Sequence, residues 1–322
     1  MRRLMLAAAA AFSLAASYAV TFTGVDASPA ELNIPANVSC RVANGSPCPK
    51  VSKERAIAEA KMAAAMAYSE QLEGRGPKSR VDSLEKWARA LSGEAPRPVV
   101  PSSPSWALPQ SPGGPRAEVR QSELQSRFWM YRQVNSYYCA PATVQSILRF
   151  LGPDVSKSRN AEGGYDRLTG DEERDQKLLA TTAWLSTDLY EGTMWGSEFI
   201  PATINAWRGT QWYVSTGTPN IEGGTLTKEQ ALAIIKFNTD RSYPVAENVE
   251  YSSRSYYPAG FYPGITYYHW DVIYGHYKEQ DGRQMVQVGQ TYSDQRLTYE
   301  RFQNVPWDLQ WGAISIWYGL VW

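Results

Sequence analysis

Cys139 is the residue of this 322-residue sequence whose type and setting best suit covalent chemistry. A thiol attacks a carbonyl only as its thiolate, so a catalytic cysteine needs a nearby base and often a helix N-terminus. Pro141 suits a first helical turn, and apolar residues recur at helical spacing from Val144 to Leu151. This pattern places the Cys139 sulfur at the positive end of a helix dipole, which stabilises a thiolate. A buried structural cysteine is the alternative interpretation.

A glutamine precedes this cysteine by six residues, and the string from Gln133 to Thr143 is Gln-Val-Asn-Ser-Tyr-Tyr-Cys-Ala-Pro-Ala-Thr. With the helix behind it, the string resembles papain-like cysteine peptidases of the bacteriocin-leader-processing (double-glycine peptidase) type. That family typically has Gln, five residues, and Cys-Gly-Pro-Ala before a helix, whereas Ala140 stands here in place of the Gly. The resemblance implies that Gln133 donates to an oxyanion hole beside the Cys139 backbone N–H. Losing one such donor costs about 3 kcal/mol in comparable sites.

The base has two candidates, His269 and His276, which are the only histidines of the chain. Residues 268–277 are Tyr-His-Trp-Asp-Val-Ile-Tyr-Gly-His-Tyr. They resemble the second motif of the same family, in which a His opens a strand of alternating aliphatics that ends in Gly-Tyr. His269 takes the catalytic position in this comparison, and His276 falls where the family has Tyr. A half-buried strand histidine that hydrogen-bonds its neighbours is the alternative, and it suits His276 better.

A third group must orient the imidazole and fix its tautomer. The family usually ends the next strand in Asp-Pro or Asn-Pro, and here Gln290 occupies that position. A glutamine carbonyl can accept from an imidazole N–H, as Asn does in papain. Asp294 is the alternative orienting residue, four positions later.

The resemblance implies a reaction that needs neither a metal nor an organic cofactor. Cys139 would attack a peptide or isopeptide bond, His269 would serve as base and then acid, and an acyl-thioester would form and be hydrolysed. The substrate would be a peptide or protein, with a cell-wall peptide among the options. Two other functions stay open: an acyltransferase of transpeptidase or transglutaminase type on the same Cys-His pair, and an inactive binding module whose aromatic residues form a recognition groove.

The N-terminus has the pattern of a secretory signal peptide. Arg2 and Arg3 precede the apolar run 4–14, and small residues offer cleavage after Ala19 or Ala27. A retained membrane anchor is the alternative, but spanning a bilayer takes about 20 apolar residues. We therefore expect a secreted or cell-envelope protein with no membrane association after removal of the signal.

Composition excludes some classes of partner and ligand. Lys and Arg balance Asp and Glu at 32 each, without a basic stripe, which argues against nucleic-acid binding. No Gly-rich phosphate loop follows a strand, so a nucleotide site has no support. In an oxidising compartment Cys40 and Cys48 are expected to form a disulfide, which leaves Cys139 as the odd thiol. Trp195, Trp207 and Trp212 suit either a substrate groove or the core.

The arrangement of elements predicts an α+β fold, of the papain-like type by resemblance, with helices first and strands later. Helical patterns cover 52–72, 81–91, 140–151, 177–190 and 228–238, and residues 122–130 suit a helix or an irregular segment. Strand patterns cover 242–250, 267–277, 283–289 and 312–321. Residues 94–116 are rich in Pro, Ser and Gly, which indicates a linker. The predicted organisation is therefore a signal peptide at 1–27, an N-terminal extension with short helices at 28–93, the linker, and a peptidase-like domain at 117–322. A propeptide, a docking module and a spacer all remain open for the extension.

Overall fold

The computed structural model describes residues 52–100, 123–152, 166–195, 198–221, 223–292 and 301–322. All of them belong to one compact unit, Val51–Trp322. The predicted signal peptide, the predicted Cys40–Cys48 disulfide and residues 101–116 of the predicted linker lie outside the described residues. The described part combines helices with an antiparallel sheet, which confirms the α+β class.

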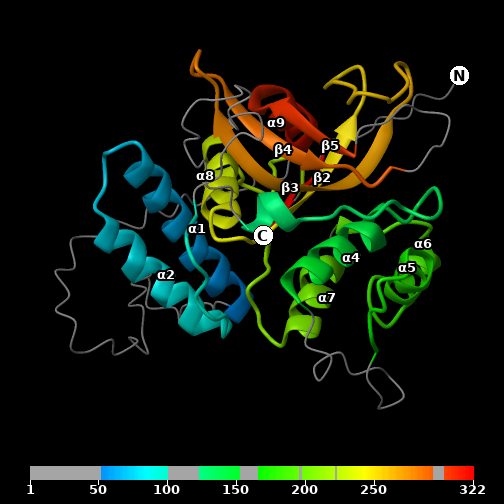
Figure 1. Cartoon of the computed structure of the whole chain (residues 1–322), viewed down its shortest axis with the longest axis horizontal. Helices are drawn as coiled ribbons and strands as arrows, with labels where there is room; N and C mark the ends of the chain where they lie inside the picture. Colours follow the sequence, from blue (N-terminus) through cyan, green and yellow to red (C-terminus); the bar gives the residue numbers. More distant parts are fainter. Residues whose placement is uncertain (1–51, 101–122, 153–165, 196–197, 222, 293–300) are drawn as a thin grey trace, which may run out of the picture. The chain divides into compact units, whose positions relative to one another are not determined.

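The sheet has six strands in the order β1-β6-β2-β3-β4-β5, and all neighbouring pairs are antiparallel. The three strands at its centre match the predicted ones closely, because β-branched and aromatic residues dominate them. Strands β3 and β4 curve around helix α9 (Figure 1). The strands are β1 (Ser215–Gly217), β2 (Val245–Tyr251), β3 (Tyr267–Lys278), β4 (Gln284–Gly289), β5 (Phe302–Pro306) and β6 (Gly319–Val321).

The helices begin where the sequence supplies caps. Ser52 accepts from the Arg55 N–H at the start of α1, and Thr227 forms a capping box with Gln230 at the start of α8. Gly93 ends α2 in the left-handed conformation that glycine adopts at low cost. The helices are α1 (Lys53–Leu72), α2 (Lys78–Ser92), α3 (Glu123–Arg127), α4 (Cys139–Leu151), α5 (Glu172–Ala180), α6 (Thr187–Tyr190), α7 (Phe199–Arg208), α8 (Lys228–Thr239) and α9 (Trp307–Ser315).

Helices α1 and α2, which precede the predicted linker, pack into the same hydrophobic core as the helices and strands that follow it. Buried residues of α1, α2, α4, α7, α8 and the sheet form one hydrophobic cluster, and α1 packs on α8 (Figure 1). Tyr68 of α1 donates to Asp240 at 2.8 Å, and Glu85 of α2 pairs with Arg241 at 2.7 Å. The first residues of the predicted linker also pack here, since Glu94 is 5% exposed and pairs with Arg208 at 2.8 Å. Residues 52–100 are therefore an integral layer of this unit.

Two predicted elements are corrected. The predicted helix 177–190 is two helices, α5 and α6, because the chain turns between Thr181 and Ser186, whose φ of 52° is incompatible with a continuing helix. The predicted strand 312–321 is the end of α9 followed by β6. Its apolar and aromatic residues satisfy either pattern. The helix begins after Pro306, the N-cap residue, whose ψ of 131° is not helical. The sequence patterns missed α7, β1 and β5.

Candidate active site

Cys139 is the first residue of α4, as the sequence predicted. Tyr138 at the cap makes no side-chain hydrogen bond to the first turn, so the backbone N–H groups there remain directed toward the region of the thiol. The cysteine is free and 9% exposed, and ten further residues of α4 are buried. A thiol at a well-packed helix N-terminus lies in the positive field of that helix.

His269 lies near the start of β3 and is 4% exposed. The strand pairs on both edges, with β2 and β4, and this fixes the direction of the imidazole. The thiol of Cys139 lies near enough to this imidazole to help raise its pKa. The structure therefore brings together two residues that are 130 positions apart in the sequence, Cys139 of α4 and His269 of β3.

Two hydrogen bonds hold α4 and the segment before it against β3 and the end of β4. The Thr143 hydroxyl, one turn after Cys139, donates to the Trp270 carbonyl at 3.1 Å. The backbone N–H of Gln133 donates to the Thr291 carbonyl at 2.7 Å. Both bonds end beside His269, so they set the position of the thiol relative to the imidazole.

The Nε2 atom of His269 faces two polar groups. Thr291 Oγ1 lies 2.9 Å from it and Asp271 Oδ1 lies 3.3 Å from it. When Nε2 carries a proton it donates to these oxygens, and the Thr291 hydroxyl donates its own hydrogen bond to the Trp270 carbonyl at 3.1 Å. This arrangement leaves Nδ1 as the nitrogen for the Cys139 thiol, and it selects one ring orientation.

Charge at this site favours the imidazolium. Burial by itself lowers the pKa of His269, but the charge and hydrogen bond of Asp271, together with those of Cys139, outweigh it and raise the pKa to about 10. Asp271 is in turn held by the Tyr251 hydroxyl, which donates to Oδ2 at 2.8 Å, and by the Thr291 N–H at 3.3 Å from Oδ1. The imidazolium thus faces a fully buried, hydrogen-bonded carboxylate.

Gln133 lies beside Thr291. Its side chain is buried, Oε1 lies 3.4 Å from the Thr291 hydroxyl, and Nε2 donates to the Asn135 carbonyl at 2.8 Å. An amide nitrogen carries two protons, so Nε2 retains a second donor.

Gln290 is buried in the same network but one step away from the imidazole. Its Nε2 donates at 3.0 Å to the hydroxyl of Tyr251, which donates to Asp271. Asp294, the alternative orienting residue, lies outside the described residues. His276 contacts Asp240 at 3.0 Å, next to Tyr68 of α1, and so it belongs to the packing of α1 on α8.

Sequence reasoning missed Asp271 and Thr291, the two groups at Nε2. A signal for Asp271 was present, because residues two apart on a strand point to the same face, and Asp271 follows His269 by two. Thr291 is adjacent to the predicted Gln290. The exact end of a strand is a weak feature of sequence, so a position one residue further along was equally compatible with the pattern.

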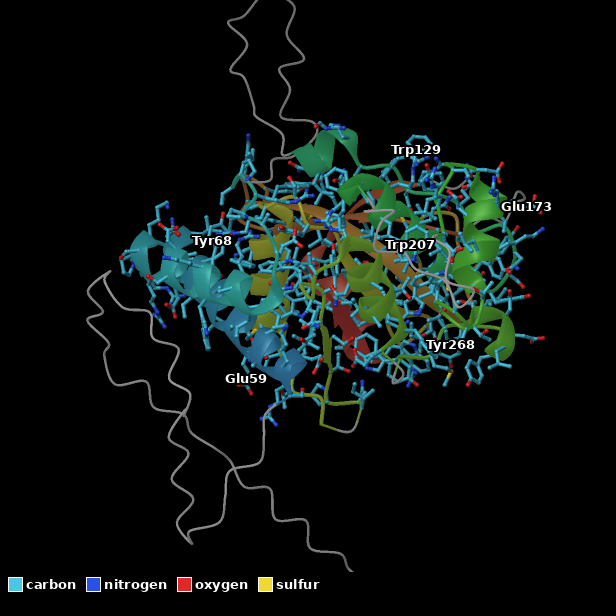
Figure 2. All side chains as sticks on the ribbon, turned by 90° about the horizontal axis from the view of Figure 1, so that it is seen from below. Glu59, Tyr68, Trp129, Glu173, Trp207 and Tyr268 are labelled. Atoms are coloured by element: carbon cyan, nitrogen blue, oxygen red, sulfur yellow. The ribbon has the colours of Figure 1, made fainter. Side chains whose placement is uncertain are left out.

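The tryptophans divide between core and site. Trp207, which is labelled in Figure 2, and Trp212 are both fully buried. Trp195 stacks on Trp270, with ring centroids 5.7 Å apart, next to His269. Tyr268, on the other side of His269, is 57% exposed and stacks on Trp317 at 4.2 Å; Figure 2 shows it at the surface. The two residues next to His269 in the sequence, Tyr268 and Trp270, are therefore both aromatic and both stacked on another aromatic ring.

Within the described residues no group of three or more His, Cys, Asp or Glu side chains is arranged to hold a metal ion. None of the helices in the described ranges is long and apolar enough to cross a membrane.

No protein-family model matches the sequence, and a comparison with curated proteins found no match. Among solved structures, the chain is similar to a bromelain protease from Ananas comosus in complex with an inhibitor. The identity is 16% and the TM-score is 0.29, with 62% of this chain and 94% of that chain covered. A TM-score of this size does not establish a shared fold.

Proposed function

We propose that this chain is an exported cysteine peptidase that hydrolyses peptide or isopeptide bonds. The observation that carries the proposal is the pairing of Cys139, at the N-terminus of α4, with His269, whose Nε2 is held by Asp271 and Thr291. A thiolate, an imidazolium and an orienting carboxylate are the groups that acyl transfer through a thioester requires.

The reaction follows from these positions. The Cys139 thiolate adds to the substrate carbonyl, and the backbone N–H of Cys139 and the second Nε2 proton of Gln133 stabilise the oxyanion. The tetrahedral adduct collapses as the His269 imidazolium gives its proton to the leaving amine, and a thioester remains. Neutral His269 then takes a proton from water, hydroxide attacks the thioester, and the carboxylic acid product leaves as Cys139 is regenerated.

The papain-like fold and membership of the double-glycine peptidase type remain part of the proposal. They are supported by the motifs around Cys139 and His269, and by the effect of the Cys139 thiol on the pKa of His269. The orienting group departs from the family pattern, since Asp271 on the same strand as His269 faces the imidazole. Export is supported by the sequence of residues 1–27, and a peptide or protein substrate by the chemistry of the pair.

Alkylation tests the proposal. We expect iodoacetamide at neutral pH to label Cys139 at least about tenfold faster than a free peptide thiol, because an imidazolium stabilises the thiolate. Peptide mapping separates this label from any at Cys40 and Cys48. In the His269→Asn variant the rate should fall to that of a free thiol, and Cys139→Ser should show no label at that position.

Peptide hydrolysis and transfer can be distinguished with the same protein. Incubation of a peptide substrate mixture with and without a primary amine shows whether water or the amine resolves the thioester. A conjugated product would assign an acyltransferase. Labelling of Cys139 at the rate of a free thiol would overturn the peptidase proposal and favour the inactive binding module.

A further inference from the structure

Glu247 is a fully buried carboxyl that the proposed mechanism does not use. It lies on β2, in the register position opposite Asp271 on β3. Both residues are 0% exposed. Directly opposed residues of an antiparallel pair point to the same face of the sheet, with Cβ atoms about 5 Å apart. Two carboxyl groups are therefore buried side by side, next to the imidazole of His269.

Two negative charges cannot be held at low cost in this position. Neither carboxylate oxygen of Glu247 has a hydrogen-bond partner that meets ordinary geometric criteria, and no ion pair involves Glu247 among the described residues. By contrast, Asp271 receives the Tyr251 hydroxyl and the Thr291 N–H and faces His269. A buried charge without such partners is strongly disfavoured, so any single charge of the pair belongs on Asp271.

Polar and titratable groups face the Glu247–Asp271 pair from each element that packs against it. His269 faces it from β3, Tyr251 from β2, Tyr256 from the loop after β2, and the Cys139 thiol from α4 beyond His269. Gln310 of α9 contributes an amide to the same cluster. Burial, followed by the charge of Asp271, raises the pKa of Glu247 well above its ordinary value, and burial likewise raises the pKa values of Tyr251 and Tyr256.

We propose that Glu247 and Asp271 form an acid pair that carries a single negative charge toward His269, with Glu247 as the member that keeps its proton. Glu247 is then a positioning residue of the proposed active site, on whose function this inference rests. One charge stabilises the imidazolium but still allows it to give its proton to a leaving amine. Two charges would bind that proton more tightly and oppose its transfer.

Infrared difference spectroscopy of the full chain at neutral pH tests the protonation of Glu247. We expect a carbonyl band of a protonated carboxyl that disappears in Glu247→Gln. Glu59→Gln is the matched control, because Glu59 is exposed and paired with Arg55 at 2.9 Å, and it should leave the band unchanged. If Glu247→Gln leaves the band region unchanged, Glu247 is ionised and the proposal is overturned.

The titration of His269 tests the single charge. The chain has only two histidines, and the imidazole NMR signal that Cys139→Ser perturbs belongs to His269. In the Cys139→Ser background, we expect Glu247→Gln to shift the His269 midpoint by less than about 0.3 pH units, since a neutral amide replaces a neutral acid. Loss of an ionised neighbour would instead lower the midpoint by about one unit or more, which would contradict the proposal.

A double-mutant comparison tests whether the charge can move within the pair. Asp271→Asn should lower the His269 midpoint, and Asp271→Asn with Glu247→Gln should lower it further, because Glu247 takes up the charge in the single variant. Equal midpoints in these two variants would contradict the proposal that the pair carries one shared charge.

If the Asp271→Asn variant does not fold, the infrared measurement and the His269 titration of Glu247→Gln still test the proposal. These readouts do not depend on peptide hydrolysis, so an inactive chain would defeat the peptidase proposal without touching the acid pair.

Discussion

Thr291 connects three parts of the candidate site through one hydroxyl. It lies 2.9 Å from His269 Nε2, 3.1 Å from the Trp270 carbonyl and 3.4 Å from Gln133 Oε1. Because a hydroxyl has one proton, its bond to the Trp270 carbonyl leaves its lone pairs for the imidazolium. Thr291 therefore fixes the ring orientation that aims the other nitrogen at Cys139.

Replacing this hydroxyl should impair catalysis more than stability. We expect Thr291→Val to lower kcat for peptide hydrolysis by about 10- to 100-fold, as loss of an orienting partner typically does. Thr291→Ser keeps the hydroxyl and should stay within a few-fold of the parent chain. Equal rates in the Val and Ser variants would show that the hydroxyl does not orient His269.

His269 also makes stability depend on pH. Although burial lowers its pKa, Asp271 and Cys139 raise it to about 10 in the folded chain, above the unfolded value of about 6.5. The folded state then binds the extra proton, so this stabilisation is complete below about pH 6.5 and is lost as pH rises toward 10.

Urea unfolding at pH 6 and pH 10 measures this effect. We expect the free energy of unfolding of the parent chain, relative to His269→Gln, to fall on the order of 3 kcal/mol between these values, since one pKa unit corresponds to about 1.4 kcal/mol. A difference that stays constant or grows with pH would contradict the assigned direction.

At the scale of elements, the site depends on the docking of α4 against β3. Each element is formed by local pattern: α4 by Pro141 and its apolar spacing, and β3 by alternating β-branched and aromatic residues. Their relative position is set by packing in the shared core and by the bond from Thr143 to the Trp270 carbonyl, which lies one turn from Cys139.

Removing that bond should disturb the site selectively. We expect Thr143→Val to cost about 1 kcal/mol of stability, together with a fall in the alkylation rate of Cys139 as the thiol moves relative to His269. Thr239→Val is the matched control, because its hydroxyl donates to the Ile235 carbonyl within α8, away from the site. If both variants alkylate equally fast, the bond does not position the thiol.

At the scale of the whole molecule, the N-terminal helices belong to the unit that carries the site. Lys61 of α1 is fully buried, donates to the Trp212 carbonyl at 2.7 Å and to the Trp322 carbonyl at 2.6 Å, and lies over both indole rings. The contacts of Tyr68 with Asp240 and of Glu85 with Arg241 add further bonds across the same interface. A removable propeptide would not be expected to complete the core in this way.

Truncation distinguishes an integral layer from a propeptide. We expect chain 51–322 to unfold cooperatively at the temperature of the full chain, whereas chain 117–322 should lack a cooperative transition, since it exposes the apolar surface that α1 and α2 cover. Circular dichroism melts and limited proteolysis would show this. A stable fragment 117–322 would support the propeptide interpretation instead.

The sequence by itself determined the helix that begins at Cys139 and proposed Cys139, His269 and Gln133 as site residues, because thiol chemistry, proline placement and motif spacing are local features. It also determined the α+β class and the central strands. Tertiary structure alone decided that Asp271 and Thr291 face Nε2, that Glu247 lies opposite Asp271, and that α1 and α2 complete the core. These depend on strand register and on contacts between residues far apart in the chain, and the order of residue types along the chain does not specify which distant partner a side chain meets.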